Sequence, residues 1–192
     1  MEALPYQDIH QPVVERCLAG DRKAQYELYK LYSKAMFNVS MRITNDYTDA
    51  EDVLQESFLN AFQHIHTFKG ESSFGAWLKR IVINQSVSLI QKRRLPLIPL
   101  EDYHESAEAR EGFLETEIDY QVGAIRQSIR KLPDGYRVVL SLYLLEGYDH
   151  QEIADILNIT ESTSKSQYSR AKRKLIELLK TTGPTEGSTP GQ

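Results

Sequence analysis

Two closely spaced prolines near the middle of the chain limit what it can fold into. Pro96 and Pro99 interrupt any helix there, since proline lacks a backbone N–H and restricts the residue before it. Acidic, weakly periodic sequence follows to about Asp119, whereas helical periodicity occupies both flanks. We therefore predict an all-α protein of two small helical domains, 10–95 and 120–182, joined by an acidic, flexible linker over 96–119 and followed by a disordered tail over 183–192.

The N-terminal domain ends in a glycine-rich loop and a basic helix. Residues 68–77 read FKGESSFGAW, a composition that favours a loop. Aromatic rings there can stack on unpaired bases at about 1–3 kcal/mol per base, and the amides of Asn84 and Gln91 can read base edges. The aromatic residues are Phe68, Phe74 and Trp77, and the basic residues that can hold phosphates are Lys79, Arg80, Lys92, Arg93 and Arg94. The alternative is a core tryptophan beside a solvated basic face.

An acidic helix precedes this loop. Thr48 and Glu51 fit a capping box, which predicts that the helix begins there and runs to about Ile65. One face would be buried, and the opposite face would present Asp52, Gln55, Glu56 and Leu59, a surface suited to a basic protein partner. An ordinary solvated face is the common alternative. A metal-dependent nuclease site built on the acids of 49–56 lacks a histidine or further acid to complete it, so we predict no metal.

Helical spacing also predicts which residues of the domain 10–95 are buried. Asp21 would cap a long helix, with Tyr26, Tyr29 and Tyr32 flanking its buried stripe. That stripe would contain Ala24, Leu28, Leu31, Ala35, Met36, Val39 and Ile43. The buried stripe of the basic helix would contain Leu78, Ile81, Val82 and Leu89. We expect His10 and His150 to be solvated.

The C-terminal half contains two helices joined by a tight turn. Asp149 and Glu152 fit a capping box, and Asn158 suits the turn. The small Ala154 would let the helices approach closely, so we predict a helix-turn-helix whose second helix, from about 161 to 180, enters the major groove of DNA. That helix would expose Ser162, Lys165, Ser166, Gln167, Ser169, Arg170 and Arg173.

The net charge of −4 conceals a separation of charge along the chain. Segments 79–94 and 165–180 are basic, whereas 46–56 and 101–119 are acidic. A single cysteine, Cys17, excludes an internal disulfide and fits a reducing compartment. The sequence has no apolar run of about 18 residues and no signal-peptide pattern at its start. We expect a cytoplasmic protein without membrane insertion.

Four segments together resemble the extracytoplasmic-function (ECF, group IV) sigma factors of the bacterial sigma-70 superfamily. They read DAEDVLQESFLNAF, TFKGESSFGAWLKRIVINQSVSLIQKRR, LPDGYRVVLSLYLLEGYDHQEIADILNI and TESTSKSQYSRAKRKL, within residues 10–180 and in the family's order and spacing. The resemblance implies a transcription initiation factor and not an enzyme, without a cofactor. Its partners would be core RNA polymerase, promoter DNA and an anti-sigma protein that holds it inactive, in some members at the membrane.

The resemblance also implies roles for individual residues. The segment similar to the family's polymerase-binding surface carries Asp52, Gln55, Glu56 and Leu59. The segment similar to the part that melts and holds the −10 promoter element carries Phe68, Lys69, Ser72, Ser73, Phe74, Trp77, Lys79, Arg80, Asn84, Ser88 and Gln91. The segment similar to the −35 reader carries Ser162, Lys165, Ser166, Gln167, Ser169, Arg170, Arg173 and Lys174.

The chain departs from the family's common pattern in the second helix of the helix-turn-helix. Ser164 stands where valine is common, and Gln167 stands where arginine is common. Glutamine pairs well with adenine and arginine with guanine, so this departure affects which −35 sequence is read. Asp149 replaces a common serine or threonine and can cap the helix equally well.

Three other functions are open to the same sequence. A stand-alone helix-turn-helix regulator would need a dimer interface or a ligand pocket, and residues 1–94 show no pattern for either. A metal-dependent nuclease would depend on Asp52. A protein-interaction scaffold would tolerate the loss of Lys165 and Arg170.

Overall fold

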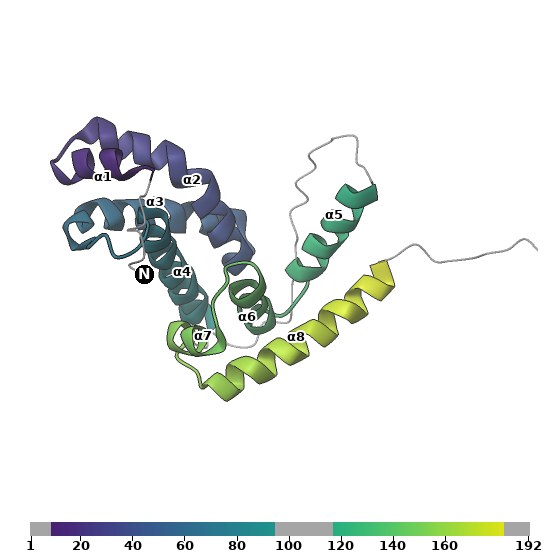
Figure 1. The fold of residues 1–192 in the computed structure, drawn as a ribbon. Helices are drawn as coiled ribbons and strands as arrows, with labels where there is room; N and C mark the ends of the chain where they lie inside the picture. Colours follow the sequence, from purple (N-terminus) through teal and green to yellow (C-terminus); the bar gives the residue numbers. More distant parts are fainter. Residues whose placement is uncertain (1–8, 95–116, 183–192) are drawn as a thin grey trace, which may run out of the picture. The chain divides into compact units, whose positions relative to one another are not determined.

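The structure is a computed structural model, and it describes residues 9–94 and 117–182. Every regular element in these residues is a helix (Figure 1), which confirms the predicted all-α fold. Close contacts along the chain divide it into two compact units, 1–96 and 97–192, which we call unit 1 and unit 2. The linker was predicted over 96–119, and its residues 96–116 lie outside the described residues. The predicted tail over 183–192 also lies outside them.

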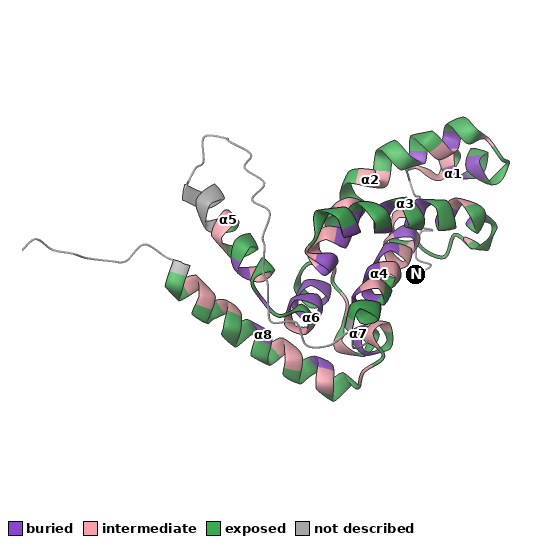
Figure 2. Ribbon diagram, turned by 180° about the vertical axis from the view of Figure 1, so that it is seen from behind, coloured by how far each residue is buried: buried purple, intermediate pink, exposed green. Residues whose placement is uncertain are grey.

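The described residues of unit 1, 9–94, form four α-helices and one short 3₁₀-helix. They are α1 (Gln11–Leu18), α2 (Arg22–Thr44), α3 (Tyr47–Gln63), η1 (Ile65–Thr67) and α4 (Phe74–Arg94). Helices α2, α3 and α4 pack against one another, and α1 packs on α2 and η1. Buried and exposed residues alternate along each helix (Figure 2) because apolar residues recur at helical spacing. The largest fully buried side chains in this unit are Phe74, Leu28, Ile43, Leu78 and Ile83.

Side chains that accept backbone N–H groups fix where α2 and α3 begin. Asp21 caps α2, as predicted, because its Oδ1 accepts the N–H of Lys23 at 2.8 Å. Asp46 caps α3 and accepts the N–H of Asp49 at 2.9 Å. The predicted capping box at Thr48 is therefore wrong, since Thr48 already lies in the first turn of α3. Helical periodicity alone did not show whether the cap lies at Asp46 or at Thr48, which are two residues apart.

An ion pair between a buried carboxylate and an exposed guanidinium joins the start of α3 to the end of α4. Asp49 is buried and its Oδ1 accepts a short hydrogen bond from Arg93. Asp49 Oδ2 has no hydrogen-bond partner among the described residues. Burial raises the pKa of Asp49, and the nearby Arg93 guanidinium lowers it by less. Arg93, which the sequence placed among the phosphate-binding residues, is thus occupied within the fold.

Two further buried polar contacts link the three long helices. The Ser86 hydroxyl of α4 donates to Ser40 Oγ of α2 at 3.2 Å. The Ser57 hydroxyl of α3 donates to Gln85 Oε1 of α4 at 2.7 Å. Because an unpaired buried hydroxyl is costly, these bonds favour a single alignment of the helices.

Within residues 117–182, unit 2 shows four α-helices around a small core. They are α5 (Glu117–Arg130), α6 (Asp134–Leu144), α7 (His150–Leu157) and α8 (Glu161–Thr182). Helix α8 packs against α5, α6 and α7. Leu132, Leu140 and Ala171 form a buried cluster, against which Leu175 and Leu178 pack. Helix α5 begins at Glu117, so the helix starts before the predicted end of the linker at residue 119.

The predicted helix-turn-helix is confirmed in α7 and α8. Asp149 and Glu152 form the full capping box, with bonds of 2.8 and 2.9 Å. Asn158 ends α7 in the left-handed region at φ 54°, which asparagine adopts more readily than most residues. Thr160 accepts the N–H of Thr163 at 3.1 Å and so starts α8.

Several residues predicted for the buried stripes lie elsewhere. Leu31 and Ala35 of α2 are exposed, and Ile81 and Leu89 of α4 are half-buried. In α4 the buried positions are instead Leu78, Val82, Ile83, Ser86, Val87 and Ile90. The buried stripe of α4 is rotated relative to the prediction because α4 is apolar around much of its circumference. Which of these apolar residues are buried depends on the packing of α4 against α2 and α3.

We expect loss of the Arg93 guanidinium to destabilise unit 1. Arg93→Ala leaves the buried Asp49 carboxylate without its cation, which should lower the free energy of unfolding by about 1–3 kcal/mol. Lys92→Ala, at the exposed neighbouring position, is the matched control. Equal unfolding midpoints in urea for the two variants would contradict the expectation.

The pKa shift of Asp49 also predicts a pH dependence of stability. Its pKa is raised from 3.8, so the folded unit holds a proton at pH values where the unfolded chain has lost it. This carboxyl therefore favours folding at acid pH, and the contribution is lost as pH rises from about 3.8 through the raised pKa. Asp49→Asn should flatten that part of a plot of unfolding free energy against pH.

Candidate functional site

Three aromatic side chains meet where the loop 68–73 joins α4. The ring centroids of Phe68 and Trp77 are 5.5 Å apart, and Phe74 lies 5.8 Å from Phe68 and 5.6 Å from Trp77. Phe68 and Trp77 are half-buried, so each ring keeps an accessible part. Phe74 is fully buried. Phe74 is therefore a core residue beneath the other two rings, and its proposed contact with DNA is not compatible with this position.

The polar residues of the loop divide into a structural one and three accessible ones. Ser73 starts α4, since its Oγ accepts the N–H of Ala76 at 3.1 Å. Lys69, Glu71 and Ser72 are exposed. Gly70 has φ +72°, in the left-handed region that favours glycine, so the backbone turns sharply between Lys69 and Glu71.

Helix α4 continues the accessible aromatic surface with a polar face. Trp77, Arg80, Asn84, Ser88 and Gln91 recur every three or four residues and so share that face. Asn84, Ser88 and Gln91 are exposed, whereas Lys79 and Arg80 are half-buried. This arrangement places an aromatic platform at one end of a row of amides and hydroxyls, beside two cations.

The predicted docking face of α3 is accessible along its whole length. Asp52, Gln55, Glu56 and Leu59 are all exposed, and Leu59 exposes 62% of its surface. An exposed leucine between acidic and amide side chains is an unfavourable solvent contact that a protein partner would remove.

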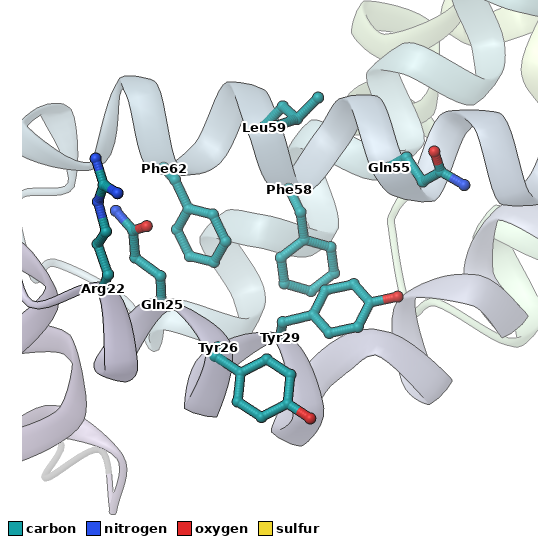
Figure 3. A pocket seen from close by; sticks show the side chains of 8 residues that line it. All are labelled: Arg22, Gln25, Tyr26, Tyr29, Gln55, Phe58, Leu59 and Phe62. Atoms are coloured by element: carbon teal, nitrogen blue, oxygen red, sulfur yellow. The ribbon is translucent and has the colours of Figure 1, made fainter.

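A groove between α2 and α3 adjoins this face. It has a volume of about 420 Å³, and Gln55 and Leu59 belong to its lining. Phe58 and Phe62 point from α3 towards α2, whereas Leu59 points away from it (Figure 3). The ring of Tyr29 lies 4.9 Å from that of Phe58. The remaining lining residues are Arg22, Gln25 and Tyr26.

Sequence reasoning missed the α2 side of this groove. Tyr26 exposes 64% of its surface and Tyr29 exposes 37%, although both were predicted to flank the core. Two tyrosines three residues apart at the margin of an apolar stripe were the available signal. The sequence alone did not show which helix would pack beside them, because that depends on the tertiary packing of α3 against α2.

In unit 2 the proposed DNA-reading residues of α8 lie mostly on one accessible face. Ser162, Lys165, Ser166, Ser169, Arg170 and Arg173 follow helical spacing and are exposed, as is Lys174. Gln167 is half-buried at the edge of this face. Lys165 pairs with Glu161 at 2.6 Å, and Lys174 pairs with Glu177 at 3.2 Å. Because both pairs are exposed, DNA phosphates can compete for the lysines at little cost.

A polar and aromatic junction holds α8 against α6 and α7. Ser164 is fully buried, and its Oγ lies 2.9 Å from His150 Nδ1. The His150 ring stacks on Tyr143 at 4.6 Å, and Tyr143 lies 4.6 Å from Tyr168. The prediction of a solvated His150 is therefore wrong. Ser164, where the family commonly has valine, is accommodated because the histidine supplies its hydrogen bond.

The described part of the chain shows no site for metal chemistry. No group of three or more His, Cys, Asp or Glu side chains in 9–94 and 117–182 is placed to hold a metal ion. Asp49, the first acid of the proposed nuclease cluster, is buried and paired with Arg93. None of the described helices combines the length and apolar character needed to cross a membrane.

Comparison with known families matches both units. The family model described as sigma-70 region 2 matches residues 28–95, and the model described as sigma-70, region 4 matches residues 123–175. The first match covers most of unit 1, including the aromatic loop, and the second covers the helix-turn-helix of unit 2.

Curated relatives extend the similarity over nearly the whole chain. The RNA polymerase sigma-H factor of Pseudomonas aeruginosa is 31% identical over 188 residues, which cover 90% of this chain and 95% of that protein. The ECF RNA polymerase sigma-E factor of Haemophilus influenzae is 31% identical and covers 87% of this chain and 93% of its own length. The ECF RNA polymerase sigma factor SigW of Bacillus subtilis is 27% identical, covering 87% and 95%.

Two solved structures share the fold. CnrH, solved with the cytosolic domain of CnrY, matches with a TM-score of 0.55 at 21% identity and covers 91% of this chain and 99% of its own. The sigma factor RpoE of Bartonella quintana, solved with the anti-sigma factor NepR, has a TM-score of 0.55 at 23% identity, covering 82% and 98%.

Proposed function

The chain belongs to the ECF sigma factors of the sigma-70 family, and on this premise we propose how its two units divide the work of starting transcription. Unit 1 docks on core RNA polymerase and opens the −10 element, and unit 2 reads the −35 element. This division is supported by the two half-buried rings of Phe68 and Trp77, which lie in contact at the end of the polar face of α4. These rings belong to unit 1, whereas the helix-turn-helix belongs to unit 2.

The docking surface for polymerase is the exposed face of α3 together with the adjoining groove. Asp52 and Glu56 supply negative charge for a basic partner, and Gln55 supplies a hydrogen-bonding amide. Leu59, Tyr26 and Tyr29 supply apolar area that is exposed in the free protein. A charged rim around exposed leucine and tyrosine is typical of protein interfaces, where such side chains become the buried centre.

The −10 element is held by the loop and the polar face of α4. Phe68 and Trp77 stack on a base that has left the duplex, and Phe74 supports both rings from the core. Lys69, Ser72, Lys79 and Arg80 hold the strand, and Asn84, Ser88 and Gln91 reach its bases. Because unstacking a base costs a few kcal/mol, capture in the loop offsets part of the cost of melting.

The −35 element is read by α8 in the major groove. Ser162, Lys165, Ser166 and Ser169 face base edges near the start of the helix, and Arg170, Arg173 and Lys174 meet phosphates further along. Gln167 contacts a base from the edge of this face. The capping box of α7 and the junction at His150 hold α8 in a fixed orientation on its own unit.

Neither unit needs to bind the promoter tightly by itself. When polymerase fixes the separation of two readers, binding of one raises the effective concentration of the other. The protein then supplies specificity and carries out no bond chemistry, which belongs to the polymerase. We place this activity in the cytoplasm, with an anti-sigma protein covering the docking surface in the inactive state and, if that protein is membrane-bound, holding the chain there.

Run-off transcription tests the function directly. Core polymerase alone is compared with core polymerase plus the full chain on a library of upstream sequences. We expect defined start sites only when the chain is present, preceded by two common sequence elements. A footprint on DNA by the chain alone, with no effect on polymerase, would instead favour a stand-alone regulator.

Two substitutions should separate docking from melting. Trp77→Ala should block formation of the open complex while polymerase association stays intact, because it removes one wall of the base-binding pair. Asp52→Arg should weaken polymerase association because it reverses a charge on the docking face. Trp77→Phe, which keeps an aromatic ring, is the control for Trp77→Ala. Glu15→Arg, at an exposed site of α1, is the control for Asp52→Arg. Open complexes at wild-type rates with Trp77→Ala would overturn the assignment of the loop.

Gln167 should set a base preference within the −35 element. Gln167→Arg should shift selection at one position from adenine to guanine, with discrimination of about tenfold or more, because arginine matches the acceptor pair of guanine. Selection of promoters from a randomised −35 library by the two holoenzymes measures the shift. Identical selected sequences would show that Gln167 does not reach a base.

A further inference from the structure

We propose that His10 and Tyr32, which the sequence predicts as a solvated histidine and an aromatic flanking the core, are positioning residues for the base-capture loop. The inference rests on the proposed role of Phe68 and Trp77. It begins with the close approach of Tyr32 to the start of α4. A Cβ atom placed on Gly75 would lie 2.8 Å from Tyr32 Cε1, which is closer than real Cβ contacts allow. The absence of a side chain at Gly75 therefore lets the Tyr32 ring lie against the helix start.

Tyr32 is also held at its other end. Its hydroxyl oxygen lies 2.7 Å from His10 Nδ1, and the two rings meet edge to face at 5.3 Å and 82°. The His10 carbonyl accepts the N–H groups of Val13 and Val14 at 3.0 and 3.1 Å and so starts α1. Val14 is fully buried, and α1 packs on α2 and on η1. His10 is thus fixed by a helix that also packs on the element directly before the loop.

From Tyr32 the contacts continue to the accessible rings. The Tyr32 and Phe74 centroids are 5.4 Å apart, and Phe74 is fully buried. Phe74 in turn contacts Phe68 and Trp77. His10, Tyr32 and Phe74 therefore form a continuous aromatic support that ends at the two rings proposed to hold the base.

The support matters because base stacking depends on ring geometry. A side chain held in place before binding loses little conformational freedom when the base arrives, and the affinity rises accordingly. The His10–Tyr32 hydrogen bond removes rotational freedom from the Tyr32 ring, and the ring limits where Phe74 can lie. Loss of that bond should weaken capture of a base without affecting docking on polymerase.

The test compares promoter opening by holoenzymes on intact and abasic templates. Each base of the −10 element is replaced in turn by an abasic nucleotide, and opening is followed by permanganate modification of unpaired thymines. Wild-type protein and Trp77→Ala identify the captured base first. If no abasic position slows the wild type, the proposed function of the loop fails, whatever Tyr32 does.

We expect Tyr32→Phe and His10→Ala each to slow opening by about 3- to 10-fold on the intact promoter, the range expected for one lost hydrogen bond. Because both remove the same bond, the double variant should match the single ones. On the template that lacks the captured base, all three should open it as fast as the wild type. Polymerase association should stay unchanged.

Two comparisons make the result specific to the loop. Tyr47→Phe removes a hydroxyl that bonds Glu51 at the opposite end of α3, and it should leave opening unchanged. Gly75→Ala should slow opening at least as much as Tyr32→Phe, because it displaces the Tyr32 ring. Wild-type rates for Tyr32→Phe on the intact promoter would overturn the proposal. So would a slowing of the same size on the abasic template, which would show that the pair only stabilises unit 1.

Discussion

The packing of α4 against α2 and α3 is the interaction on which unit 1 depends. One side of α4 supplies Leu78, Val82 and Ile83 to the core, and the other carries the polar row that begins at Trp77. The same rotation of the helix therefore sets both the core and the candidate DNA surface. The hydrogen bonds from Ser86 to Ser40 and from Ser57 to Gln85, together with the Asp49–Arg93 pair, favour one rotation over its neighbours. The polar face of α4 remains accessible because the apolar side of the helix packs against α2 and α3.

Much of this fold could be predicted from the sequence, because helical periodicity and helix caps are local signals. Asp21, the capping box at Asp149 and the turn at Asn158 were recognised from residues within one turn of each other. The proline pair indicated two domains, and the motifs of both domains indicated the family. Accessible surfaces on α3 and α8 followed from spacing alone.

The sequence could not supply what depends on distant partners. Phe74 looked equivalent to Phe68 and Trp77, yet it is buried because Tyr32 of α2 covers it. Arg93 looked like a phosphate ligand, but Asp49, 44 residues earlier, pairs with it. His150 looked solvated, although Ser164 and Tyr143 enclose it. In each case local pattern gave the residue's chemistry, and tertiary packing decided which partner that chemistry meets.

Trp77 is the only tryptophan in the chain, and it lies half-buried near the start of α4 beside Phe68. Light at wavelengths absorbed by indole but not by phenol excites this one side chain, although the chain has 11 tyrosines. A nucleobase stacked on the indole quenches its emission. Emission from Trp77 would therefore report the base capture proposed for this site without an attached dye.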